Sequence, residues 1–154
     1  MTPNALIAAL RLIDKPVCTE AADRLVASAG RASGFDLHLR RAGLSADDAR
    51  ILSDGMRAAE GDGGLDLRSF SASYNPDLGD KGAAALADAF PAKMTELELV
   101  GCSIGDGGAQ NLLAWAHKAP ALTMICIEGN QISPDLKARF RDLGNRGRYV
   151  LVVV

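Results

Sequence analysis

A pattern of apolar residues that occurs twice in the second half of the chain limits the possible folds more than any other feature. The two copies are MTELELVGCSI at residues 94–104 and LTMICIEGNQI at residues 122–132, and every position recurs 28 residues later. Each copy contains an apolar pair separated by one residue, such as Leu97 and Leu99. Because side chains alternate between the two faces of a strand, both pairs are expected to point inward from neighbouring parallel strands.

Two weaker copies lie upstream and extend the same pattern toward the N-terminus. Their matching residues are Leu37, Leu39, Ala42 and Leu44 in one copy, and Leu67, Phe70, Ala72, Asn75 and Leu78 in the other. The second of these contains one inserted residue, so its strand has two possible registers. Either Leu65 and Leu67 or Phe70 and Ala72 point inward. We favour the Phe70 register because it keeps Asn75 in its expected place.

Each copy is followed by signals for a helix. An apolar residue stands eight positions after the last residue of each copy: Leu52, Leu86, Leu112 and Phe140. Ser45 and Asp48 have the spacing of a capping box, and Pro134 after Ser133 suits a first helical turn. Each unit therefore predicts a strand, a tight turn and a helix.

The pattern resembles the leucine-rich-repeat consensus L-x-x-L-x-L-x-x-N/C-x-L, in which Cys is allowed at the Asn position. The sequence IGDGGA at residues 104–109 is similar to the ribonuclease-inhibitor-like subclass. The resemblance implies an α/β fold, namely a short right-handed solenoid with a parallel sheet on the concave side and helices on the convex side. Residues 34–154 would form this repeat domain, with about four repeats and a terminal strand. Asn75 and Asn130 would turn inward to satisfy backbone groups, and the Cys102 thiol would do so more weakly.

Residues 1–33 contain no repeat and predict an N-terminal helical cap. Leu6, Ile7, Leu10 and Ile13 lie on one face of a first helix, which Lys15-Pro16 ends. Thr19 is expected to cap a second helix, and Gly30 to terminate it. The terminal repeats of a solenoid need a capping element of this kind, with a polar outer face.

Composition and net charge argue against two classes of binding partner, nucleic acids and membranes. The chain has 154 residues, a formal net charge of −2 and no long apolar run, which argues against nucleic-acid binding and against a membrane span. Three cysteines without a C-x-x-C spacing indicate a reducing compartment, and no secretory signal is evident. We therefore expect a cytoplasmic protein, although export without a cleavable signal stays open.

The outward residues of the four strands form a mixed polar row that predicts a protein-binding surface on the concave face. These residues are His38, Arg40, Ser71, Ser73, Glu98, Val100, Cys126 and Glu128. The resemblance implies a non-enzymatic interaction module with a protein partner. The row of strand residues contains no aromatic anchor, which indicates a weak partner or contacts made elsewhere.

The same residues argue against catalysis, metal binding and cofactors. His38 and Cys126 lie on the first and fourth strands, about 14 Å apart at sheet spacing, which is too far for a nucleophile and its base. Ser71 and Ser73 lack a correctly ordered relay. With only two histidines in the chain, no set of metal ligands is evident. We expect no enzymatic activity and no cofactor.

The segment YVLVVV at residues 149–154 is strongly strand-forming and supports an alternative function. An uncovered apolar edge strand can pair with another chain. The alternative is a structural unit that forms a homodimer through Tyr149, Leu151, Val152 and Val153.

Overall fold

A computed structural model describes residues 3–28, 34–63, 65–145 and 147–154. In chain order, its helices and strands are α1 (Asn4–Ile13), α2 (Pro16–Ala27), β1 (Phe35–His38), α3 (Ala46–Gly61), β2 (Leu67–Ser71), α4 (Gly79–Ala89), β3 (Glu96–Glu98), α5 (Asp106–His117), β4 (Met124–Cys126), α6 (Pro134–Arg141), the 3₁₀ helix η1 (Asp142–Gly144) and β5 (Leu151–Val153). None of the helices described is both long enough and apolar enough to cross a membrane.

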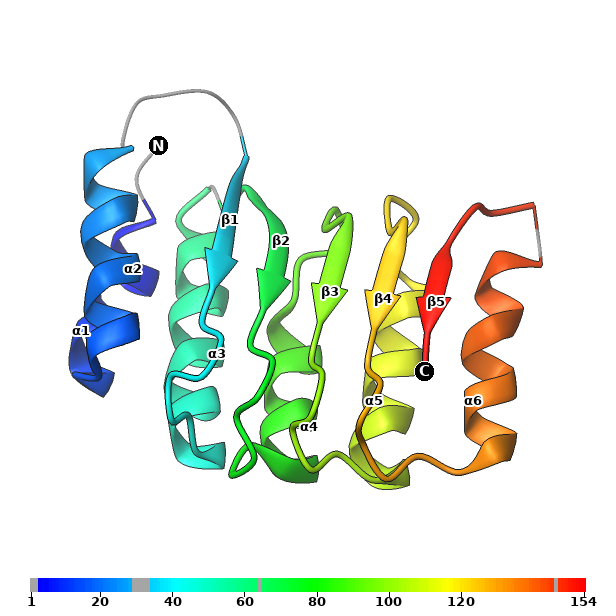
Figure 1. Ribbon diagram of the computed structural model, residues 1–154. Helices are drawn as coiled ribbons and strands as arrows, with labels where there is room; N and C mark the ends of the chain where they lie inside the picture. The colour runs from blue at the N-terminus through cyan, green and yellow to red at the C-terminus, as the bar shows by residue number, and fades with distance from the viewer. Residues whose placement is uncertain (1–2, 29–33, 64, 146) are drawn as a thin grey trace.

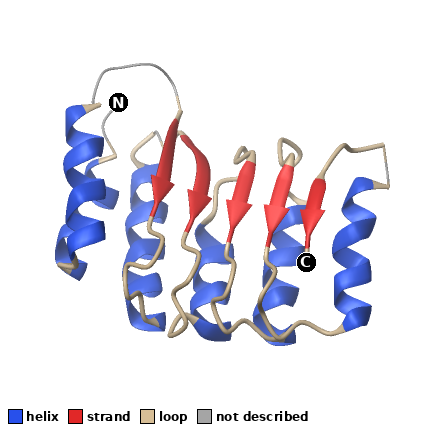
Figure 2. Ribbon diagram, in the orientation of Figure 1, coloured by secondary structure: helices blue, strands red, loops and turns tan. Residues whose placement is uncertain are grey.

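The strands form one parallel sheet in the order β1-β2-β3-β4-β5 (Figure 1). Helices α3 to α6 all lie on one face of this sheet, and α1 and α2 lie beside its β1 end (Figure 2). The opposite face, which we call the strand face, carries no helix (Figure 2). This arrangement confirms the α/β class and the parallel sheet that the repeat predicted.

The strand register agrees with the repeat at each strand. Leu37 pairs with Phe70, Phe70 with Leu97, Leu97 with Ile125, and Ile125 with Val152. The first four side chains are buried in the core and Val152 is half-buried. The Phe70 register of the second strand is therefore correct. Leu65 and Leu67 are also fully buried, but they enter the core at the start of that strand.

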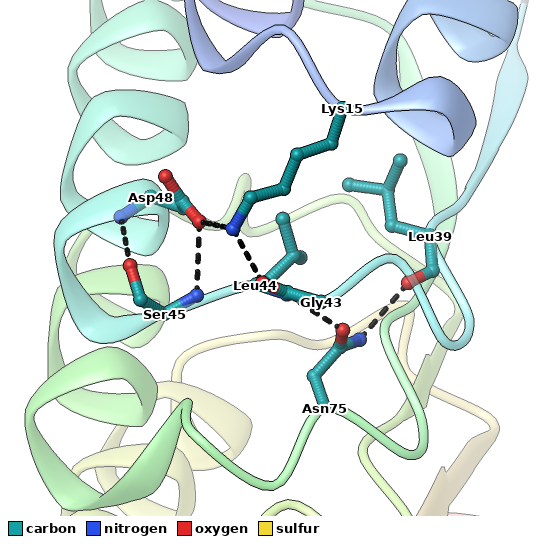
Figure 3. Close-up of polar contacts among 7 residues, drawn as sticks. All are labelled: Lys15, Leu39, Gly43, Leu44, Ser45, Asp48 and Asn75. Atoms are coloured by element: carbon teal, nitrogen blue, oxygen red, sulfur yellow. Dashed lines mark hydrogen bonds and ion pairs between the residues drawn. The ribbon is translucent and has the colours of Figure 1, made fainter.

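Two asparagines that turn inward, Asn75 and Asn130, join successive copies, as the sequence predicted. The Asn75 side chain accepts a hydrogen bond from the Leu44 N–H at 2.9 Å and donates to the Leu39 carbonyl at 2.9 Å (Figure 3). It also donates to the Ala72 carbonyl at 2.7 Å. In the later copy, Asn130 accepts hydrogen bonds from the N–H groups of Cys102 and Ile104 and donates to the carbonyls of Leu99 and Ile127, with a longer bond to the Glu128 carbonyl. The Cys102 thiol donates to the Ala72 carbonyl at 3.2 Å. These bonds hold the chain where it leaves each strand.

The helix starts agree with the sequence at two places and differ at one. Ser45 and Asp48 form the capping box of α3, and the Ser133 hydroxyl accepts from the Leu136 N–H at the start of α6. Thr19, however, does not cap α2. The helix already begins at Pro16, because proline fits the first helical turn and needs no hydrogen-bond partner for its nitrogen. Gly30, predicted to end this helix, lies outside the described residues.

Lys15 and Cys18 both lie at the start of α2. Cys18 lies in α2 and is fully buried, which raises its pKa to about 11. The Lys15 ammonium donates to the Gly43 carbonyl and to the Asp48 carboxylate (Figure 3). Partial burial raises the pKa of Asp48, but the bonds from Lys15 and from the Ser45 N–H outweigh it, so the pKa lies below its usual value. Lys15 thus ties the N-terminal helices to the start of α3.

Candidate functional site

The strand face carries the eight residues predicted to bind a partner, at different depths. His38, Arg40 and Glu128 are exposed, whereas Glu98, Val100 and Cys126 are half-buried. Ser71 and Ser73 are buried, although both were predicted to be contact residues. Their side chains are short and lie between longer neighbours, and the Ser73 hydroxyl accepts a hydrogen bond from the Val100 N–H at 3.0 Å. Ser73 therefore supports the next strand.

A hollow of about 370 Å³ on the strand face collects six of the eight residues. Its lining comes from all five strands or from the segments just after them: Arg40, Ser73, Tyr74, Glu98, Val100, Met124, Cys126, Glu128, Leu151 and Val153. His38 lies outside it and instead lines a second hollow between β1 and α2, together with Arg24 and Ser28. The eight predicted residues therefore do not form one site, because six line this hollow and His38 lines the other.

The character of the hollow changes from one end to the other. Arg40 lies at its β1 end, and two carboxylates, Glu98 and Glu128, follow over β3 and β4. At the far end Leu151 and Val153 pair with Met124 and Cys126, so the surface there is apolar. Leu151 and Val153 had been assigned to self-association, but they also extend the strand face by one strand.

Tyr74 is the functional candidate that the sequence analysis missed. Its ring is 41% exposed, and the guanidinium carbons of Arg40 and Arg41 lie 4.7 Å and 5.0 Å from its centroid. The hollow therefore has an aromatic residue, although the row of eight predicted residues contains none. The prediction considered only residues within the strands, whereas Tyr74 occupies the turn position just after β2. Aligning that turn across the copies places Tyr74 with Arg41, Gly101 and Gly129, and this comparison could have found it.

The geometry gives no pair of groups suited to nucleophilic catalysis on this face. His38 and Cys126 lie on β1 and β4, with two strands between them. Burial raises the pKa of the Cys126 thiol, which lowers the fraction of reactive thiolate. Among the residues with described positions, no three His, Cys, Asp or Glu side chains cluster as metal ligands would.

A comparison with known protein families matches one segment of the chain. Residues 91–113 match the family described as Leucine Rich repeat. The chain contains a leucine-rich repeat. This repeat includes β3, the turn that follows it and most of α5. A search of curated proteins finds no match.

Proposed function

We propose that this protein is a non-enzymatic interaction module that binds a partner protein through the strand face. In this proposal the whole of residues 34–154 is a right-handed leucine-rich-repeat solenoid of the ribonuclease-inhibitor-like subclass, and the strand face is its concave side. The observation that carries the proposal is the hollow to which all five strands contribute, on the face that no helix covers.

The dimensions of the hollow favour an extended segment of the partner. From β1 to β5 there are four inter-strand spacings of about 4.8 Å, or about 19 Å in all. An extended chain advances about 3.4 Å per residue, so about six residues would cross the five strands. Its side chains would meet Arg40 at one end and Leu151 at the other.

Selection from a library of displayed random peptides tests this proposal. We expect selected peptides to bind the wild-type protein and to lose at least tenfold in affinity when Glu98→Arg reverses a charge in the middle of the hollow. Asp88→Arg is the matched control, because Asp88 lies in α4 and its side chain is 79% exposed on the helical side. The proposal fails if the selected peptides bind Glu98→Arg as well as they bind the wild-type protein, or lose as much affinity with Asp88→Arg.

The alternative function, self-association through the C-terminal strand, has one observation in its favour. β5 is the last strand of the sheet and is hydrogen-bonded to β4 on one side. Tyr149 is 87% exposed and Leu151 is 55% exposed, so two large apolar side chains accompany this edge. A second copy could pair with it in antiparallel fashion around a two-fold axis.

Light scattering distinguishes this alternative from the main proposal. If β5 joins two copies, we expect a dimer that becomes a monomer with Leu151→Lys, because a lysine disfavours pairing at a sheet edge. Leu151 is a better position than Val152, which is in register with the buried Ile125. Leu12→Lys is the control, since Leu12 is 72% exposed on α1 at the other end of the chain. A monomeric wild-type protein excludes the alternative.

A further inference from the structure

Arg40, which lines the β1 end of the hollow, and its neighbour Arg41 are free to bind an anion. Within the described part of the chain, the side chains of Arg40 and Arg41 form no ion pair and no hydrogen bond. Five other arginines of this part are paired with aspartates, namely Arg11, Arg50, Arg57, Arg68 and Arg139, whereas Arg148 donates to backbone carbonyls. Among the described residues, Arg24 and Arg141 also form no ion pair, so the contact with Tyr74 is what distinguishes Arg40 and Arg41. What holds Arg40 and Arg41 in place is the Tyr74 ring, which both guanidinium groups approach within 5.0 Å.

The backbone at this cluster is strained in a way that the repeat itself does not require. The same turn position after each of the first four strands lies in the left-handed region: Arg41 at φ 52°, Tyr74 at φ 60°, Gly101 at φ 61° and Gly129 at φ 72°. Glycine adopts this conformation without cost, whereas a large side chain adopts it with strain. The last two turns show that glycine satisfies the fold. Arg41 and Tyr74 therefore keep large side chains at a position that glycine could occupy, and these side chains contact each other.

We propose that Arg40, Arg41 and Tyr74 form a receptor for a carboxylate side chain of the partner polypeptide. This inference rests on the proposed function, because it specifies what the β1 end of the strand face recognises. A guanidinium group binds a carboxylate through two parallel hydrogen bonds. The tyrosine ring restricts both arginine side chains before binding, so less conformational entropy is lost when the anion arrives.

The other residues of the strand face determine which anion the cluster prefers and which further residue the partner segment carries. Glu98 and Glu128 lie in the same hollow as Arg40, so a doubly charged phosphate is disfavoured more than a singly charged carboxylate. The apolar end at Leu151 and Val153 lies three to four strand spacings from the cluster, or about 14–19 Å. The partner segment would therefore have an acidic residue and an aliphatic residue about five positions apart in an extended chain.

An NMR titration tests the receptor without any partner. The probe is an acetylated, amidated tri-glutamate peptide, added to ¹⁵N-labelled protein while the arginine Nε–H signals are followed. We expect the signals of Arg40 and Arg41 to shift and saturate, whereas that of Arg141, an exposed arginine of α6, does not. A tri-glutamine peptide should have no effect. Inorganic phosphate, titrated at the same ionic strength, should bind more weakly than tri-glutamate.

Tyr74→Gly is the decisive variant. Glycine accepts the positive φ of this position, so the fold is retained, but the ring that orders the arginines is lost. We expect at least a fivefold weaker Kd for tri-glutamate. The receptor is excluded if Arg40 and Arg41 respond no more than Arg141, if Tyr74→Gly leaves the Kd unchanged, or if phosphate binds more tightly. Such a failure would leave partner binding by the rest of the strand face intact, and the peptide selection measures that separately.

Discussion

Replacement of Asn75 by alanine is expected to lower the free energy of unfolding by about 3–5 kcal/mol. The Asn75 side chain is fully buried and satisfies three backbone groups, those of Leu44, Leu39 and Ala72. Alanine offers none of these bonds, and each buried group left without a partner costs about 1–3 kcal/mol. Because a domain is typically stable by only about 5–15 kcal/mol, this one change should remove a large part of the total. Urea denaturation followed by circular dichroism measures it.

Asn130→Ala is the matched comparison, because Asn130 makes the same type of bonds to the next copy. Asn130 is only half-buried, so water can replace part of what the amide provides. We expect a smaller loss, about 1–2 kcal/mol, although more bonds are removed. If the two variants lose equal stability, or Asn130→Ala loses more, then burial does not determine the strength of these links.

The sequence predicted the inward-facing half of each copy well, and the reason is physical. Inward positions have one environment in every copy, so Leu97 and Ile125, or Asn75 and Asn130, recur as similar residues at fixed spacing. The inserted residue in the second copy left two registers open for its strand. The Phe70 register was selected because it keeps Leu67, Asn75 and Leu78 at their expected positions in the repeat, and the strand pairing agrees with it.

The outward-facing half was predicted less well, because each outward position has its own surroundings. Whether a serine on the strand face is exposed depends on the lengths of the side chains on both neighbouring strands, and Ser71 proved to be buried. Tyr74 was missed because it stands at a turn where two other copies have glycine. The sequence analysis also placed the start of α2 too late, because it took Thr19 as the helix cap although the helix begins at Pro16. Local signals at Pro16 and Thr19 compete, and tertiary packing of the N-terminal helices contributes to the choice.

A second substitution with a large expected effect lies where α1 packs closely against α3. Gly55 lies in the middle of α3, where α1 packs against it. A Cβ atom at this position would lie 2.6 Å from the Ala9 Cβ and 3.0 Å from the Ala5 carbonyl oxygen. Atoms cannot remain that close, so α1 must move away from α3. Because Leu6 and Leu10 are fully buried on α1, this movement also loosens the core.

We therefore expect Gly55→Ala to lower the free energy of unfolding by about 2 kcal/mol, even though alanine favours a helix interior over glycine by about 1 kcal/mol. Gly61→Ala is the control within the same helix. No atom lies within 4 Å of a Cβ at Gly61, so its effect should be below about 0.5 kcal/mol. Thermal and urea unfolding of both variants measure the difference.

A compensating substitution separates a steric effect from any other. Adding Ala9→Gly to Gly55→Ala removes the 2.6 Å contact but leaves the contact with the Ala5 carbonyl oxygen. The double variant should therefore be more stable than the sum of the two single changes predicts, by about 1 kcal/mol. Additive single effects would mean that α1 does not depend on close approach to Gly55. In that case the contact between the N-terminal helices and the first repeat would depend mainly on Lys15 and its bonds to Gly43 and Asp48.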